Sequence, residues 1–98
     1  MENTKVVFND NGYGEVQLFS NDTKAGEMVI SINHAKLVVY HTEVRPEYEG
    51  QGFAKILLDQ LVGYARENGL KIIPLCPYVY AQFRRHATLY ADIWSNVH

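Results

Sequence analysis

Gly50 and Gly52 stand where a strand-like segment gives way to a helical one. The apolar run that ends at residues 41–44 leads through Pro46 into Gly50-Gln51-Gly52, and a helical pattern begins directly afterwards. A glycine turn that opens a helix leaves backbone N–H groups unpaired and pointing at one spot, with the positive end of the helix dipole behind them. Such a site binds anions, most often phosphate. Alternatively, the two glycines make only a tight turn.

Cys76 is the only cysteine of the chain and lies at the end of the apolar segment 71–76. It precedes Pro77, a residue suited to the first position of a helix. Because a helix N-terminus lowers the pKa of a nearby thiol, Cys76 is a candidate nucleophile. Free cysteines are also among the most commonly buried residues, and many have no chemical role. The sequence leaves both interpretations open.

The elements that position these residues begin with four predicted strands. They span residues 4–8, 14–20, 27–33 and 36–44, with turn-forming clusters between them. Together they predict an antiparallel meander. In the fourth strand, alternation predicts that one set of side chains shares a face and a second set shares the opposite face. The first set is Leu37, Val39 and His41, and the second is Val38, Tyr40 and Thr42.

The second half changes period. Apolar residues recur at three- and four-residue steps from Ala54 to Ala65, which predicts an amphipathic helix that ends at Asn68-Gly69. Segment 71–76 is so continuously apolar that we expect a strand buried on both faces, parallel to the fourth strand and next to it. A second helix is expected at 78–86, and a short strand or turn within 87–98. The predicted fold class is therefore α+β, with a mixed sheet.

Pro74 falls inside the last predicted strand, where a proline deletes a ladder hydrogen bond. It fits if this strand parts from its neighbour there and leaves a gap beside the glycine loop. Ligands of open sheets bind at the carboxyl ends of parallel strands, which is the same place. The alternative is that Pro74 merely sits on an edge of the sheet.

The composition limits the possible partners and the compartment. Ninety-eight residues with 47% hydrophobic content predict one small domain over 1–98. A net charge of −2 and a pI near 6.0 give no electrostatic reason to expect nucleic acid or an anionic membrane as partner. The segment at 1–10 has no apolar signal core, and a single cysteine suits a reducing compartment. We expect a cytoplasmic protein.

Several segments together resemble the small GNAT-like acyltransferases, minimal relatives of the GNAT acetyl-coenzyme A transferases. They are His-Thr-Glu-Val at 41–44, Glu-Gly-Gln-Gly-Phe-Ala at 49–54, Lys-Ile-Ile-Pro-Leu-Cys-Pro at 71–77 and the segment 78–86. The resemblance covers most of the chain. It implies a GNAT-like fold and a transfer of acetyl from acetyl-coenzyme A to an amine.

The resemblance also implies where the coenzyme binds. Its pyrophosphate would lie on the loop Glu49, Gly50, Gln51, Gly52, Phe53 and Ala54. Its pantetheine arm would lie between the two parallel strands, against strand backbone that includes Thr42 and Val44, and we expect contacts with Pro77. A backbone N–H at about Thr42 to Val44 would polarise the thioester carbonyl. Arg84 would reach the 3′-phosphate, or it is a solvated residue of a helix end. Glu49 departs from the pattern, which has Gln or Arg there, and a carboxylate repels phosphate.

Acyl transfer needs a base, and His41 titrates near neutral pH. Glu43 is the competing base, and His41 could equally be a packing residue of a strand. Two routes follow: direct attack by the acceptor amine, or a covalent acetyl-Cys76 intermediate. In larger GNAT enzymes a tyrosine protonates the leaving thiolate, and Tyr78 and Tyr80 lie near that end of the cleft. The resemblance assigns this role to neither of them, and both could equally be core or interface residues.

The chain is shorter than a full GNAT domain, mainly between its first strands, where larger relatives roof the acceptor site. The acceptor is therefore an unidentified amine, on a small molecule or a protein side chain. We expect a monomer, or a weak homodimer if Phe19, Tyr90 or Trp94 forms an exposed patch. Two other functions remain open, a non-catalytic acyl-coenzyme A binding module and an interaction domain that binds no coenzyme.

Overall fold

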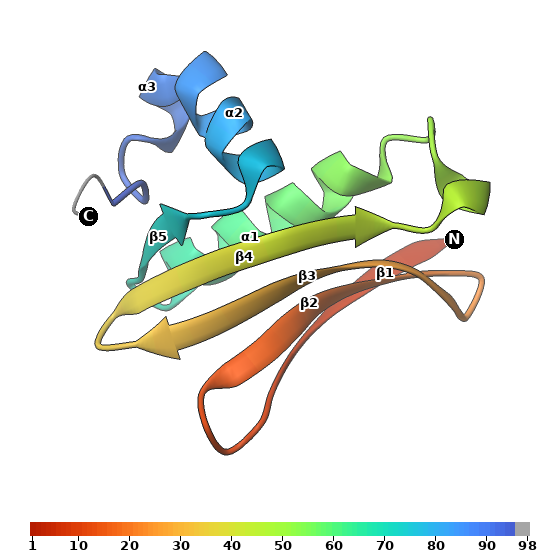
Figure 1. Cartoon of the computed structure of the whole chain (residues 1–98), viewed down its shortest axis with the longest axis horizontal. Helices are drawn as coiled ribbons and strands as arrows, with labels where there is room; N and C mark the ends of the chain where they lie inside the picture. Colours follow the sequence, from red (N-terminus) through yellow and green to blue (C-terminus); the bar gives the residue numbers. More distant parts are fainter. Residues whose placement is uncertain (96–98) are drawn as a thin grey trace.

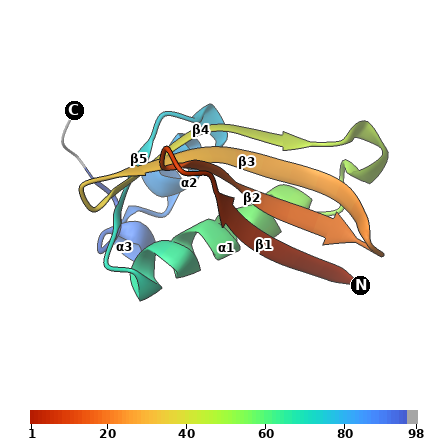
Figure 2. The same cartoon turned by 90° about the horizontal axis from the view of Figure 1, so that it is seen from below.

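The computed structural model describes residues 1–95 and shows a five-stranded sheet with one long helix packed on one face (Figures 1 and 2). The strands lie in sequence order, antiparallel from β1 to β4, with β5 parallel to β4. They are β1 (Glu2–Phe8), β2 (Tyr13–Ser20), β3 (Thr23–Asn33), β4 (Lys36–Val44) and β5 (Lys71–Pro74). The helices are a 3-10 turn η1 (Pro46–Tyr48), α1 (Phe53–Glu67), α2 (Pro77–Arg85) and α3 (Ala87–Tyr90). The predicted α+β class, meander, crossover and second helix are confirmed.

Short turns connect the strands of the meander. The side-chain carbonyl oxygen of Asn9 accepts hydrogen bonds from the backbone N–H groups of Asn11 and Tyr13, at 2.9 and 3.1 Å. Between β2 and β3, Asn21 and Asp22 take the left-handed conformation, with φ of 49° and 70°. Asn and Asp tolerate this conformation well, so two residues suffice to reverse the chain. The third strand consequently begins at Thr23, four residues before its predicted start.

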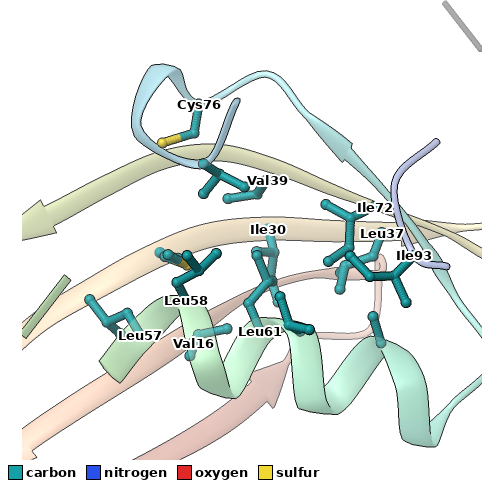
Figure 3. Close-up of a cluster of buried hydrophobic side chains, with 14 of the residues drawn as sticks. Val16, Ile30, Leu37, Val39, Leu57, Leu58, Leu61, Ile72, Cys76 and Ile93 are labelled. Atoms are coloured by element: carbon teal, nitrogen blue, oxygen red, sulfur yellow. The ribbon is translucent and has the colours of Figure 1, made fainter. Parts of the chain in front are cut away.

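The core lies between α1 and the inward face of the sheet (Figure 3). As predicted, the apolar stripe of α1 is buried, whereas Lys55 and Asp59 on its opposite side are exposed. The stripe faces the buried side chains of β2, β3 and β4, and each leucine in it contributes roughly 1.5–3 kcal/mol by burial. The buried residues of α1 are Phe53, Leu57, Leu58, Leu61, Val62 and Ala65.

A β-bulge in β4 corrects the predicted assignment of faces. Ile30 pairs with Val39 but Val29 pairs with His41, so Tyr40 is an extra residue without a partner on β3. Paired residues of an antiparallel ladder share a face, and the extra residue shifts the alternation by one position. Thr42 therefore lies on the helix side with Leu37 and Val39, and His41 lies on the opposite side. The prediction had these two residues the other way round.

Strand β5 also differs from its prediction. It is the edge strand of the sheet, it ends at Pro74, and Leu75 is 60% exposed. The expectation of a strand buried on both faces over 71–76 is therefore wrong. Ile72 is buried in the core, whereas Leu75 lies in the exposed loop that follows β5. Pro74 lies both on an edge and at the point where pairing ends, so the two interpretations of this proline are compatible.

The segment after α2 closes the edge beside β5. The predicted short strand or turn is in part a helical turn, α3, followed by a single parallel bridge between Ile72 and Trp94. The N–H of Ile72 donates to the carbonyl of Ile93, and the N–H of Ser95 donates to the carbonyl of Ile72. The Arg66 guanidinium forms two hydrogen bonds, of 2.9 and 3.1 Å, with the carboxylate of Asp92. The predicted segment extends to residue 98, and its last three residues lie outside the described ones.

No described helix covers the face of the sheet opposite α1 (Figure 2). The open face includes Tyr13 on β2, Ser31 on β3 and Tyr40 and His41 on β4, as the strand register and burial pattern require. Among the described residues, no helix is long and apolar enough to cross a membrane.

Candidate active site

The parallel strands β4 and β5 diverge halfway along β4. Their pairing ends where Val39 meets Pro74, and the N–H groups of Leu75 and Cys76 both donate to the Val39 carbonyl at 3.0 Å. Beyond this point β4 continues for five residues with no pairing partner on that edge among residues 1–95. The predicted gap beside Pro74 is confirmed as a divergence of the two strands.

The bulge decides which backbone groups face this divergence. The N–H of Leu75 bonds to Val39, and the N–H of Arg45 bonds to Ala25 on β3. Because successive residues of a strand direct their N–H and C=O groups to alternate sides, Thr42 and Val44 direct theirs to the free edge. These are the two residues expected to hold the pantetheine arm through their backbone.

The glycine loop lies at the far end of the free edge. Gly50 and Gly52 have φ of 82° and 77°, a conformation that favours glycine. Gly52 caps α1 without a side-chain hydrogen bond, and the first intrahelical bond runs from the Ile56 N–H to the Gly52 carbonyl. The N–H groups of residues 53–55 thus have no partner within the helix.

A surface hollow of about 350 Å³ lies directly at these amides. Its lining residues are Val44, Tyr48, Glu49, Gly50, Gly52, Phe53 and Ala54. A Cβ atom added to Gly50 or Gly52 would meet nothing within 4 Å, so a ligand can approach the backbone closely at both positions. The hollow therefore fits a phosphate group held by backbone amides.

The side chains of Glu47, Glu49 and Gln51, which lie near the loop, occupy different positions. Glu49 borders the hollow at the helix N-terminus, and its side chain is exposed. Glu47 borders a second hollow of about 430 Å³, together with Glu27, Glu43 and Arg45. Gln51 is exposed and does not line the first hollow. Among the described residues that line the first hollow, Glu49 is the one that carries a negative charge.

Cys76 lies across the divergence from the free half of β4. Its Sγ atom is 3.1 Å from the Oγ1 atom of Thr42, and the residue is only 2% exposed. Figure 3 shows the side chain projecting from the loop between β5 and α2, above Val39. The hydrogen bond between Thr42 and Cys76 joins the two sides of the divergence. A thiol in this position needs a local movement before it can reach a ligand.

His41 and Glu43 lie together on the open face of β4. The Nε2 atom of His41 is 3.6 Å from Oε1 of Glu43, and the two side chains are 58% and 62% exposed. They project away from α1, whereas Thr42 between them projects toward it. The structure thus pairs the two candidate bases with each other and separates them from Cys76.

The structure distinguishes the two candidate tyrosine acids. Burial raises the pKa of Tyr78, the nearby Lys55 ammonium lowers it in part, and the charges of Tyr90, Asp59 and Cys76 raise it further. Tyr78 is half-buried against the core, near Lys55 and Asp59 of α1, and it stays protonated at neutral pH. Tyr80 packs against the edge of Trp94, with ring centroids 6.3 Å apart, on the other side of α2.

The remaining predicted contacts lie on α2. Pro77 is its exposed first residue and begins the helix directly after Cys76. Arg84 is in its last turn, and its guanidinium lies over the ring of Tyr80, 5.8 Å from the centroid. Arg84 does not border the hollow at the glycine loop. Its contact with a 3′-phosphate stays a prediction.

Two features of this region were not predicted from the sequence. Tyr48 lines the hollow and stacks on Phe53, with ring centroids 5.5 Å apart. The bulge at Tyr40 is the second. Its signal is present in the sequence, because Leu37 and Val39 are in phase with Thr42 and Val44 only if one residue is skipped.

Comparisons with known proteins agree with this architecture. Residues 15–93 match the family model described as GCN5-related N-acetyl-transferase. The chain therefore belongs to the GCN5-related N-acetyltransferase family, and the predicted resemblance to this family is confirmed. A search of the curated proteins found no match.

Solved structures of several acetyltransferases share the fold. A GCN5-like putative N-acetyltransferase from Staphylococcus aureus is 25% identical, with a TM-score of 0.68 over 96% of this chain and 90% of that one. The ribosomal-protein-S18-alanine N-acetyltransferase from Escherichia coli is 19% identical, with a TM-score of 0.66 over 83% of this chain. The ribosomal-protein-alanine N-acetyltransferase from Brucella melitensis biovar Abortus 2308 is 22% identical, with a TM-score of 0.64 over 91% of this chain. This chain spans 54% of the Escherichia coli protein and 66% of the Brucella protein.

Proposed function

We propose that this protein transfers an acetyl group from acetyl-coenzyme A to an amine. The observation that carries the proposal is the divergence of β4 from β5 directly beside unpaired helix amides. The free edge at Thr42 and Val44 suits an extended amide-bearing chain, and the amides of residues 53–55 suit a pyrophosphate. One cofactor, coenzyme A, carries both groups, and members of this family act on acetyl groups.

In this proposal the two substrates approach from opposite faces of the sheet. The hollow at the glycine loop and the side chain of Thr42 lie on the α1 side, where the coenzyme would enter. His41 and Glu43 lie on the open face, from which the amine would approach. The uncovered face accommodates a bulky amine or a protein side chain, so the acceptor is an amine with unhindered access. We propose that the chain, residues 1–98, acts as a single domain that would hold both.

In the proposed reaction each residue has one task. Acetyl-coenzyme A supplies an activated acetyl carbon, which forms a bond to the amine nitrogen as its bond to sulfur breaks. The backbone N–H of Thr42 or Val44 polarises the carbonyl. His41 takes the proton of the amine while Glu43, 3.6 Å away, orients the imidazole. Tyr78, which is protonated at neutral pH, gives its proton to the departing thiolate.

Direct attack is the route that the geometry favours. Cys76 is buried and its sulfur already contacts the hydroxyl of Thr42. A covalent route would form a thioester at Cys76 and then lose it to the amine, and both steps require this contact to open. Incubation with acetyl-coenzyme A and no acceptor, followed by digestion and mass spectrometry, distinguishes the routes. An unmodified Cys76 peptide is expected, and an acetylated one would establish the covalent route.

Calorimetry with coenzyme A tests the proposed site. The wild-type protein should bind, and Gly52→Asp should abolish binding, because it strains a residue at φ 77° and places a carboxylate at the helix amides. Gly63→Ala is the matched control, since Gly63 lies within α1 with open space around its Cβ position. Undiminished binding by Gly52→Asp would contradict the loop assignment.

Consumption of acetyl-coenzyme A with a panel of amines then separates an enzyme from a non-catalytic acyl-coenzyme A binding module. Thioester loss that depends on an added amine supports the transferase. Binding without any thioester loss would support the binding module, and absence of binding would support an interaction domain.

A further inference from the structure

We propose that Tyr40 and Ser31 form a clamp that sets the bulge of β4 and, through it, the opening that admits the coenzyme. In this proposal Tyr40 is a positioning residue. This inference rests on the proposed function, because it concerns how the binding edge of β4 is held in place.

The clamp consists of one hydrogen bond between neighbouring strands. The hydroxyl groups of Tyr40 and Ser31 are 2.7 Å apart, and Ser31 is only 8% exposed. Tyr40 is the extra residue of the bulge, whereas Ser31 pairs with Val38, two residues before it. The tyrosine side chain therefore reaches back across the bulge to β3. A nearly buried hydroxyl needs a partner, so Ser31 holds Tyr40 in this orientation.

A third strand supports the same ring. Tyr13 on β2 pairs directly with Ser31, and its ring stacks on that of Tyr40, with centroids 6.4 Å apart and planes at 26°. Tyr40 thus contacts both β3 and β2 from the open face. The direction in which the extra residue projects is fixed by contacts that lie outside the core.

The position of the extra residue determines the binding edge. With Tyr40 as the unpaired residue, the backbone groups of Thr42 and Val44 face the divergence, as described above. If Tyr40 paired with a residue of β3, the backbone groups of His41 and Glu43 would face the divergence instead. A fraction of molecules in that second arrangement would lower the apparent affinity for the coenzyme in proportion.

The clamp can be tested apart from the stability of the fold. Tyr40 and Tyr13 are 38% and 54% exposed, so their contacts add little to the core. The most conservative variant is Tyr40→Phe, which keeps the ring and removes the hydroxyl. Ser31→Ala removes the other partner, and Ser31→Thr keeps a hydroxyl group there. Tyr13→Phe is the matched control, because no hydrogen bond of its hydroxyl is present among residues 1–95.

Calorimetry with coenzyme A and thermal unfolding provide the two readouts. Tyr40→Phe and Ser31→Ala should each weaken binding by up to about five-fold, the limit set by a loss of about 1 kcal/mol, and should lower Tm by at most about 4–8 °C. The double variant should be no weaker than either single variant, because both remove the same hydrogen bond. Ser31→Thr and Tyr13→Phe should bind as the wild type does. With an identified acceptor, KM for acetyl-coenzyme A should rise while kcat stays constant.

Any of three results would overturn the clamp alone. Two of them are wild-type affinity in both hydroxyl variants and additive losses in the double variant. The third result is a fall in Tm so large that unfolded protein, present during the binding measurement, explains the lost affinity. Tyr40 and Ser31 would then contribute only to the stability of the fold. A wild-type protein that fails to bind coenzyme A would overturn the proposed function itself, and the clamp with it.

Discussion

The two halves of β4 have opposite environments although they belong to one strand. Residues 36–39 pair on both edges, with β3 and β5, and Leu37 and Val39 are fully buried. Within residues 1–95, Tyr40 has no pairing partner and residues 41–44 pair with β3 alone, and their side chains are exposed or half-buried. One extra residue, Tyr40, and a short neighbouring strand that ends at Pro74 separate the two halves. A structural strand becomes a binding edge through these two local changes.

The largest expected effect contrasts the stability of the two halves. Leu37→Ala removes a fully buried side chain and should lower the free energy of unfolding by about 2–5 kcal/mol. Glu43→Ala, in the free half, alters an exposed side chain and should change it by no more than about 0.5 kcal/mol. Urea unfolding of both variants measures the difference. Equal losses would show that the free half is as integral to the fold as the paired half.

An intermediate effect is expected on backbone hydrogen exchange. Coenzyme A should slow exchange at the amides of Thr42 and Val44, because it supplies the hydrogen-bond partners that these positions lack. The amides of Leu37 and Val39 face β5 and should change much less. Exchange followed by NMR, with and without coenzyme A, tests this. Uniform protection along β4 would instead indicate general stabilisation by the ligand.

The smallest expected effect is on thermal stability, at the end of the sheet where β4 and β5 are paired. There the ion pair between Arg66 and Asp92 joins α1 to the segment beside β5. The guanidinium holds the pKa of Asp92 below its usual value. A carboxyl with a lowered pKa in the folded state stabilises the protein above its unfolded pKa, near 3.9, and loses this contribution as the pH falls. Asp92→Asn should therefore lower Tm slightly at pH 7 and should lower it less at pH 3.

The control for this variant is its affinity for coenzyme A, which should stay at the wild-type value because the ion pair lies far from the free half of β4. Equal changes in Tm at both pH values would mean that the ion pair does not stabilise the fold. Weaker coenzyme binding would mean that the paired end of β4 and β5 also sets the width of the opening.

The sequence allowed most of the fold to be predicted. The periods of two and 3.6 identified the meander and α1, because one face of each element must be apolar to form a core. The glycines at 50 and 52 located the helix start, since their backbone conformation is restricted to few residue types. The boundaries of β3 and β5 were less accurate, because the turn at 21–22 and the end of pairing at Pro74 depend on neighbouring strands.

For the candidate site, the sequence by itself determined which residues could take part: a glycine loop before a helix, a histidine and a glutamate two positions apart, and one cysteine at the end of a strand. Tertiary structure decided how they combine. The extra residue at position 40 moved His41 to the open face and turned Thr42 toward Cys76. Regular alternation predicts the opposite, because a bulge arises from the pairing of two strands and is not a property of one segment. The burial of Cys76 has the same origin, since α2 and β4 enclose it only after the chain has folded.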